Sequence, residues 1–209
     1  MDYFQKIQNQ ADITFTTSLD FSKPELRTLE NINIILLNSL FSEFVDDIEL
    51  CCISCDLQYC KNLRNLCIAI DSEDVSPLGI SILFATLKKC LNIRVLHLDF
   101  SYTKFDDVWA QLLCQSLLNI KKIQDLQIIL NSIKISPQCA TNLTSCIAQL
   151  NDLNNLKLSF HRSSFNRLTE KTFQFNENLL NLELFLRQFY LINSNYLIVI
   201  LYYNVAIKF

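Results

Sequence analysis

One apolar pattern returns in this sequence at an interval of thirty residues. The octets LRNLCIAI, IRVLHLDF, IQDLQIIL and LNNLKLSF begin at Leu63, Ile93, Ile123 and Leu153. Each octet has apolar residues at its first, fourth, sixth and eighth positions. Alternation over the last three positions is the period of a β-strand with one buried face, so each octet predicts a strand.

Each predicted strand is followed by the sequence signals of a helix. A five-residue connection ends in a recurrent apolar residue, at Val75, Phe105, Ile135 and Phe165. Directly after it stand residues typical of a helix N-cap: Ser76, Asp106, Ser136 and Asn166. Proline follows two of these caps, where its missing N–H costs nothing. Three stripes with helical period come next: Ile80, Leu83, Leu87 and Cys90; Ala110, Leu113, Leu117 and Ile120; Ala140, Leu143, Ile147 and Leu150.

A single strand–loop–helix unit cannot bury both its strand face and its helix stripe, whereas stacked units can. Weaker copies extend the array upstream, as LENINIIL from residue 29, and downstream, as LLNLELFL from residue 179. The segment FSEFVDDIELCCISCDLQY supplies a helix before Leu63. We therefore expect about six units at 29–186, an irregular N-terminal cap at 1–28, and an apolar C-terminal tail at 187–209 that caps the other end.

The strand pattern L-x-x-L-x-L resembles the leucine-rich repeat, and the long helix after it is similar to the ribonuclease-inhibitor-like class of that family. The ninth positions, Asp71, Ser101, Asn131 and His161, depart from the asparagine ladder of the family, and the apolar eighth position and the scarcity of glycine also differ. The resemblance implies an α/β solenoid with a parallel sheet on its concave side and helices on its convex side. It also implies a scaffold that binds other proteins through the concave face.

The outward face of the predicted sheet is the candidate binding surface. If the fourth, sixth and eighth positions point into the core, the fifth and seventh point away from it. Neighbouring strands lie about 4.8 Å apart, so these positions form two continuous columns. The columns contain Asn33, Ile35, Cys67, Ala69, His97, Asp99, Gln127, Ile129, Lys157, Ser159, Glu183 and Phe185. Ile129 and Phe185 are apolar anchors among polar neighbours, which favours a protein partner; the alternative is a solvated face.

Composition argues against several other functions. With a single glycine, Gly79, the chain cannot contain a Walker A loop, G-x-G-x-x-G or G-x-S-x-G, which excludes P-loop NTPases and complete protein kinases in their usual forms. A formal charge of −3, without basic runs among aromatics, argues against nucleic acid. The start, MDYFQKIQNQADITF, lacks the apolar core of a secretory signal. The nine cysteines are therefore expected to be reduced thiols in an intracellular, cytoplasmic protein.

Cysteine supplies two candidate sites, and a structural interpretation is favoured for both. Cys52 and Cys55 form C-x-x-C, but no second ligand pair follows at zinc spacing. They share a helical stripe that is expected to be buried: Phe44, Ile48, Cys51, Cys52, Cys55 and Tyr59. Cys67 beside His97 lacks an evident pocket for nucleophilic catalysis. We therefore expect no enzyme, no catalytic residue, no metal and no cofactor.

Two alternative functions remain open. Similar repeats occur fused to kinase domains, so the chain could be a non-catalytic regulatory segment related to larger kinase-domain proteins. Residues 188–207 carry no charge and are long enough to cross a bilayer, which would make the protein a tail-anchored membrane adaptor. Polar residues at 193, 194, 195 and 204 interrupt that segment, and its β-branched and aromatic residues favour one or two final strands instead.

Overall fold

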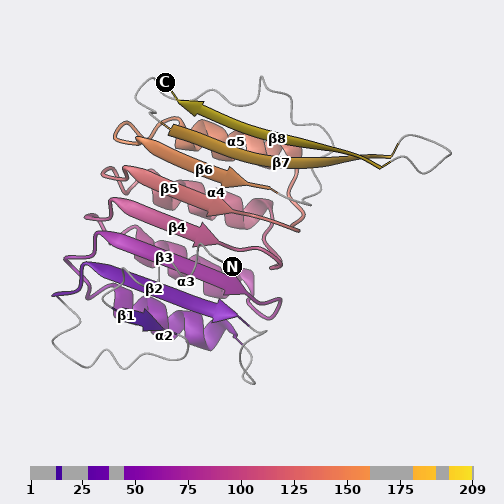
Figure 1. Cartoon of the computed structure of the whole chain (residues 1–209). Helices are drawn as coiled ribbons and strands as arrows, with labels where there is room; N and C mark the ends of the chain where they lie inside the picture. The colour runs from indigo at the N-terminus through magenta and orange to yellow at the C-terminus, as the bar shows by residue number, and fades with distance from the viewer. Residues whose placement is uncertain (1–12, 16–27, 38–44, 161–180, 192–197, 209) are drawn as a thin grey trace.

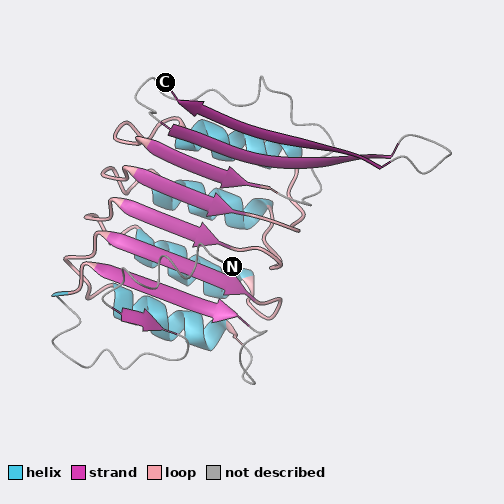
Figure 2. Ribbon diagram, viewed as in Figure 1, coloured by secondary structure: helices cyan, strands magenta, loops and turns pink. Residues whose placement is uncertain are grey.

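The computed structural model describes residues 13–15, 28–37, 45–160, 181–191 and 198–208. They form one eight-stranded sheet, with helices packed behind it (Figures 1 and 2). The strands are β1 (Ile13–Phe15), β2 (Asn31–Leu37), β3 (Asn65–Asp71), β4 (Val95–Asp99), β5 (Asp125–Ile129), β6 (Asn155–Ser159), β7 (Asn181–Leu191) and β8 (Ile198–Lys208). The helices are α2 (Asp47–Leu57), α3 (Pro77–Leu87), α4 (Asp107–Leu117) and α5 (Pro137–Ile147).

The order of the strands in the sheet is their order in the chain, so each strand pairs with the next. Strands β1 to β7 are parallel, and β8 pairs antiparallel with β7. Leu66 pairs with Leu96, and the next two steps to Leu126 and Leu156 keep the thirty-residue interval. The predicted α/β fold, with parallel strands alternating with helices, is confirmed for β2 to β6.

The core lies between the sheet and the helices. Every inward position of the four octets is 3% exposed or less, and all three predicted helix stripes are buried. Aromatic side chains cluster in this layer beyond the carboxyl end of β4: Phe100 stacks on Phe105 at 5.7 Å between ring centroids, and Trp109 meets Phe105 edge-on at the same distance. The alternating apolar positions of the octets therefore correctly predict which strand residues are buried.

The helices begin where the sequence predicts. The Ser76 hydroxyl accepts a hydrogen bond from the Leu78 N–H at 3.1 Å, and the Ser136 hydroxyl accepts one from Cys139 at 3.1 Å. The Asp106 carboxylate accepts from Val108 and Trp109, both at 3.0 Å. These bonds satisfy N–H groups that the first helical turn leaves without an intrahelical partner. The predicted cap at Asn166 lies outside the described residues.

The predicted buried stripe of α2 is wrong. Ile48, Cys52, Cys55 and Tyr59 are exposed, Cys51 is half-buried, and Phe44 lies outside the described residues. The buried residues of α2 are Leu50, Ile53, Ser54 and Leu57. Leu50, Ile53 and Leu57 correspond to Ile80, Leu83 and Leu87 of the next unit. The repeat thus sets which side of α2 faces the sheet, and the cysteines lie on the opposite side.

The C-terminal part of the sheet includes most of the uncharged segment 188–207. Residues 188–191 end β7 and residues 198–207 lie in β8, as the β-branched composition favours. None of the helices in the described ranges is long and apolar enough to cross a bilayer. The helix predicted after Phe160 and most of the predicted N-terminal cap lie outside the described residues.

Candidate functional site on the sheet face

The strand register brings the predicted column residues side by side. Cys67 pairs with His97, His97 with Gln127, and Gln127 with Lys157. In the second column Ala69 pairs with Asp99, followed by Ile129, Ser159 and Phe185 on successive strands. Residues separated by thirty positions in the chain therefore become neighbours on one surface.

The columns differ in exposure. Asn33, Ile35, Cys67, Ala69, Gln127 and Ser159 are buried, with Gln127 only 3% exposed. His97, Asp99, Ile129 and Lys157 are partly exposed. The side chains of Glu183 and Phe185 lie outside the described residues. Among the described column residues, a partner can therefore reach the sheet only at the four partly exposed positions.

A third column, which the sequence reasoning missed, lies on the same face. It consists of the third positions of the units, Asn31, Asn65, Val95, Asp125 and Asn155. His97 Nε2 lies 3.1 Å from Asp125 Oδ1, and the Asn155 amide donates to Asp125 Oδ2 at 3.5 Å. Asn65 likewise donates to Asn31 on the preceding strand. Strand parity would have identified this column, because third, fifth and seventh positions share one side of a strand.

The carboxyl ends of β4 to β6 carry a second polar network. Asp99 accepts a hydrogen bond from the Ser101 N–H at 2.9 Å, and the Ser101 hydroxyl accepts one from the Asn131 N–H at 3.2 Å. The Ser159 hydroxyl donates to Asn131 Oδ1 at 2.8 Å. Ser101 and Asn131 occupy the ninth positions, where the resemblance implies an asparagine ladder. Side chains of different types thus connect neighbouring units at this edge.

Burial controls the acid–base properties of this face. Burial raises the pKa of Asp99, the hydrogen bonds from Ser101 partly oppose that rise, and the nearby Asp71 adds to it. Burial also raises the pKa of the Cys67 thiol to about 12, with a smaller contribution from Asp99. A cysteine nucleophile reacts as the thiolate, so Cys67 beside His97 lacks the ionised sulfur that such chemistry needs near neutral pH.

The C-x-x-C pair lies far from this face, on the solvent side of α2. All nine cysteines are free thiols, and Cys52 and Cys55 are exposed. Among the residues that the structure describes, no three His, Cys, Asp or Glu side chains are grouped so as to hold a metal ion.

No known protein-family model matches the sequence, and a search of curated proteins also gives no match.

Proposed function

We propose that the protein is a non-enzymatic scaffold that binds a partner protein through the strand side of a leucine-rich-repeat-like solenoid. The observation that carries this proposal is the column arrangement. Each unit contributes side chains at the same register positions, so chemically varied residues line up across β3 to β6. Surfaces of this kind extend over several units and suit a macromolecular ligand.

The spacing of the two layers supports a curved array. Consecutive strands are neighbours in the sheet, and the helices α2 to α5 pack on one another in the same order. Strands lie about 4.8 Å apart, whereas packed helices need about 8–10 Å. Because each unit contributes one strand and one helix, neighbouring units must lie further apart on the helix side than on the strand side. The strand side is then concave, and a partner would contact residues from several units at once.

The partly exposed residues give this face the mixed character of a protein interface. Ile129 supplies an apolar contact, Lys157 a cation, and Asp99 an anion at the edge of the sheet. His97 lies on β4, in the same column as Lys157 but two strands away, and is held by Asp125 at 3.1 Å. Interfaces commonly combine an apolar anchor with polar groups that set orientation. Ile129 is expected to be the main anchor, and Lys157 the group that selects an acidic counterpart.

The test uses a partner captured from native cells, purified, and titrated calorimetrically against the wild type and variants. Ile129→Asp with Lys157→Glu is expected to weaken binding at least tenfold, while its circular dichroism spectrum stays unchanged. Leu91→Asp is the matched control, because Leu91 is an exposed leucine outside the sheet. Leu126→Asp is expected to unfold the protein, because it places an unpaired charge in the core. Equal affinities of the wild type and the folded double variant would refute this binding face.

A further inference from the structure

The helical layer exposes a row of large apolar side chains. The second residues of α2, α3 and α4 are Ile48, Leu78 and Val108, which are 70%, 64% and 53% exposed. Because α2 packs on α3 and α3 on α4, these equivalent positions lie in one row across three helices. A second, less exposed row follows one turn later. We call the two rows together the helix-face patch: Ile48, Cys52, Leu78, Ile82, Val108 and Leu112.

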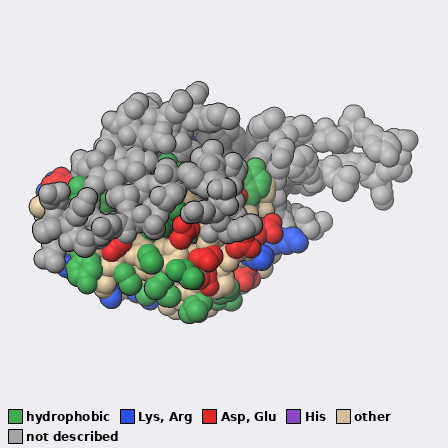
Figure 3. Space-filling model, turned by 90° about the horizontal axis from the view of Figure 1, so that it is seen from below, with side chains coloured by type: hydrophobic (Ala, Val, Ile, Leu, Met, Phe, Trp, Pro, Cys, Tyr) green, Lys and Arg blue, Asp and Glu red, His purple; other side chains and the backbone are tan. Residues whose placement is uncertain are grey.

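The patch ends at α5, where Gln138 and Asn142 take the equivalent positions. Among the described helices, the apolar surface is therefore limited to α2, α3 and α4. In Figure 3, which views the molecule from below, hydrophobic side chains gather on one side with acidic side chains next to them. An exposed apolar surface that is continuous over several elements is typical of a binding site.

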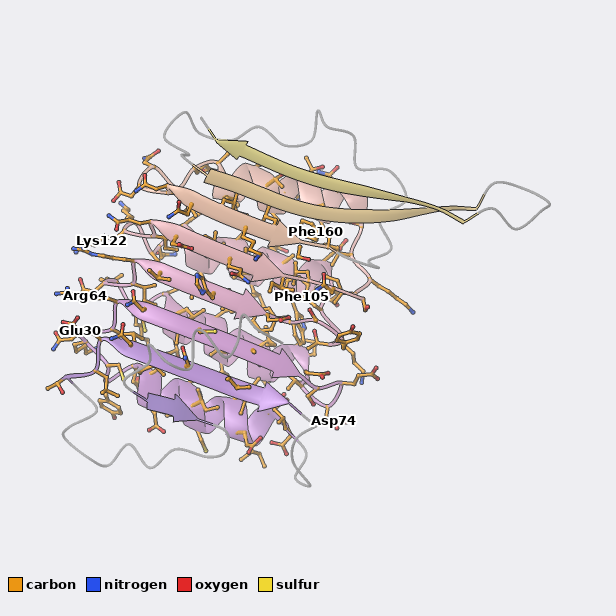
Figure 4. The ribbon with its side chains drawn as sticks, in the orientation of Figure 1. Glu30, Arg64, Asp74, Phe105, Lys122 and Phe160 are labelled. Carbon is orange, nitrogen blue, oxygen red and sulfur yellow. The ribbon has the colours of Figure 1, made fainter. Side chains whose placement is uncertain are left out.

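An acidic rim borders the patch at the N-terminal ends of the helices. It consists of Asp46, Asp47, Glu49, Glu73, Asp74, Asp106 and Asp107. Two basic residues lie at the same ends of the helices, Lys104 in the loop before α4 and Lys134 in the loop before α5. The opposite edge is basic, with Lys61, Arg64, Lys88, Lys89, Arg94, Lys121 and Lys122. Figure 4 shows Arg64 and Lys122 at one edge of the sheet, where Glu30 pairs with Arg64 at 3.6 Å, and Asp74 at the other edge.

We propose that the helix-face patch binds a basic amphipathic helix of a partner protein. Apolar contact with the patch supplies the binding surface, and the acidic rim selects lysine and arginine on the flanks of the incoming helix. The same rim disfavours two other occupants. A second copy of this chain would bring a like-charged rim against it, and an anionic membrane surface would also be repelled.

The spacing of the row matches a helix that lies across α2, α3 and α4. Packed helices are about 8–10 Å apart, so Ile48, Leu78 and Val108 follow one another at about that interval. Residues seven apart on an α-helix are separated by about 10.5 Å along its axis. A partner helix with apolar residues at positions i, i+7 and i+14 would therefore meet all three side chains.

The experiment uses a fluorescent eighteen-residue helical peptide with leucine at i, i+7 and i+14 and lysine on both flanks. A matched peptide carries glutamate in place of lysine. By fluorescence anisotropy, the full chain is expected to bind the basic peptide, with weaker binding at higher salt, and to leave the acidic peptide unbound. Leu78→Lys is expected to weaken binding at least tenfold. Leu91→Lys, which alters an exposed leucine outside the patch, is expected to leave it unchanged.

The double variant Glu73→Lys with Asp74→Lys tests the rim without altering the apolar row. It is expected to weaken binding of the basic peptide at least threefold, and circular dichroism checks that each variant is folded. Equal binding of the two peptides, or unchanged binding by folded Leu78→Lys, would overturn the proposal. So would a wild-type dimer that Leu78→Lys separates, since the occupant would then be a second copy. Leu78-dependent binding to phosphatidylserine vesicles, without binding to the basic peptide, would assign the patch to lipid.

Discussion

Asp107 at the start of α4 accepts both hydrogen bonds that Ser136, the N-cap of α5, can donate. The Ser136 N–H reaches Asp107 Oδ1 at 2.9 Å, and its hydroxyl reaches Oδ2 at 2.6 Å. Asp47 and Ser76 repeat this arrangement between α2 and α3. At the junction between α3 and α4 the equivalent position is Pro77, which has no carboxylate. The helix starts thus alternate with a period of two units, Asp-Asp followed by Ser-Pro.

The first prediction concerns the charge of Asp107. The hydrogen bonds from Ser136 lower the pKa of Asp107, and burial opposes them weakly. A lowered pKa contributes stability above the unfolded-state value of 3.8, and this stability is lost as the pH falls through the folded-state pKa. Because Asp107 is exposed, solvent screens its charge, and Asp107→Asn is expected to reduce the free energy of unfolding by about 0.5–1 kcal/mol at pH 7. The loss should shrink towards zero as the pH falls below the unfolded-state value.

Urea unfolding at pH 7, 5 and 3 measures this difference. Asp152→Asn, at an exposed loop residue, is the matched control and is expected to have no effect at any of the three pH values. A loss that stays the same from pH 7 to pH 3 would show that the charge of Asp107 does not strengthen its bonds to Ser136.

The second prediction concerns Gly79, the only glycine of the sequence. A Cβ atom at this position would clash with Asp47 Oδ1 and lie 3.2 Å from the backbone Cα of Asp47. Gly79 therefore allows α2 and α3 to approach closely. Alanine in a helix normally gains about 1 kcal/mol over glycine, but the clash should outweigh that gain. We expect Gly79→Ala to lower the free energy of unfolding by about 1–2 kcal/mol.

The double variant Asp47→Ala with Gly79→Ala separates the clash with the Asp47 carboxylate from the close approach to the Asp47 backbone. Removing the Asp47 carboxylate relieves the closest contact, so Gly79→Ala is expected to cost less in the Asp47→Ala background than in the wild type. Equal costs in the two backgrounds, measured by thermal unfolding, would place the conflict at the backbone of Asp47 alone.

The inward faces of the strands and helices could be predicted from the sequence, because each strand–helix unit places equivalent residues in the same surroundings. Leu66, Leu96, Leu126 and Leu156 occupy the same register position in successive strands, so each reports the same burial. Exposure on the outer surfaces could not be predicted in this way. Gln127 is buried and Ile129 partly exposed, although both belong to the outward columns of one strand. Burial on that face depends on residues outside the strand, which its own pattern does not encode.

The error on α2 has a different cause. Cysteine, isoleucine and tyrosine occur on both buried and exposed surfaces, so an apolar stripe on one helix does not identify its buried side. Comparison with the next unit identifies the buried side of α2, because Leu50, Ile53 and Leu57 align with the buried Ile80, Leu83 and Leu87. The helix-face patch could not be predicted for another reason, because its residues lie thirty positions apart and become neighbours only when the helices pack side by side.

The third prediction uses the cysteines to test these exposures. Burial raises the pKa of Cys67 to about 12 and that of Cys60 and Cys90 to about 11, so these thiols hold their protons near neutral pH. At pH 7.5 iodoacetamide is expected to modify the exposed Cys52 and Cys55 and to leave the three buried thiols unmodified until urea is added. Peptide mass spectrometry measures the modification at each site.

Raising the pH to 9 provides a further check. Labelling of the exposed Cys55 should become faster, whereas Cys67 should stay unlabelled because its pKa of about 12 remains well above the pH. Early modification of Cys67 in the native protein would contradict the burial of the Cys67 side chain on the sheet face. Protection of Cys52 and Cys55 would mean that the α2 stripe predicted from the sequence is buried.

The fourth prediction concerns Trp109, whose side chain is fully buried against Phe100 and Phe105. Within the described residues, its indole Nε1 has no hydrogen-bond partner. Burying such a donor without a partner costs about 1–3 kcal/mol. Trp109→Phe removes the donor and keeps an aromatic ring, so the regained desolvation energy offsets part of the lost packing. We expect a net loss of about 1 kcal/mol or less, against about 2–5 kcal/mol for Leu113→Ala on the same helix. Chemical denaturation measures both, and a loss of about 3 kcal/mol or more for Trp109→Phe would mean that Nε1 is hydrogen-bonded in solution.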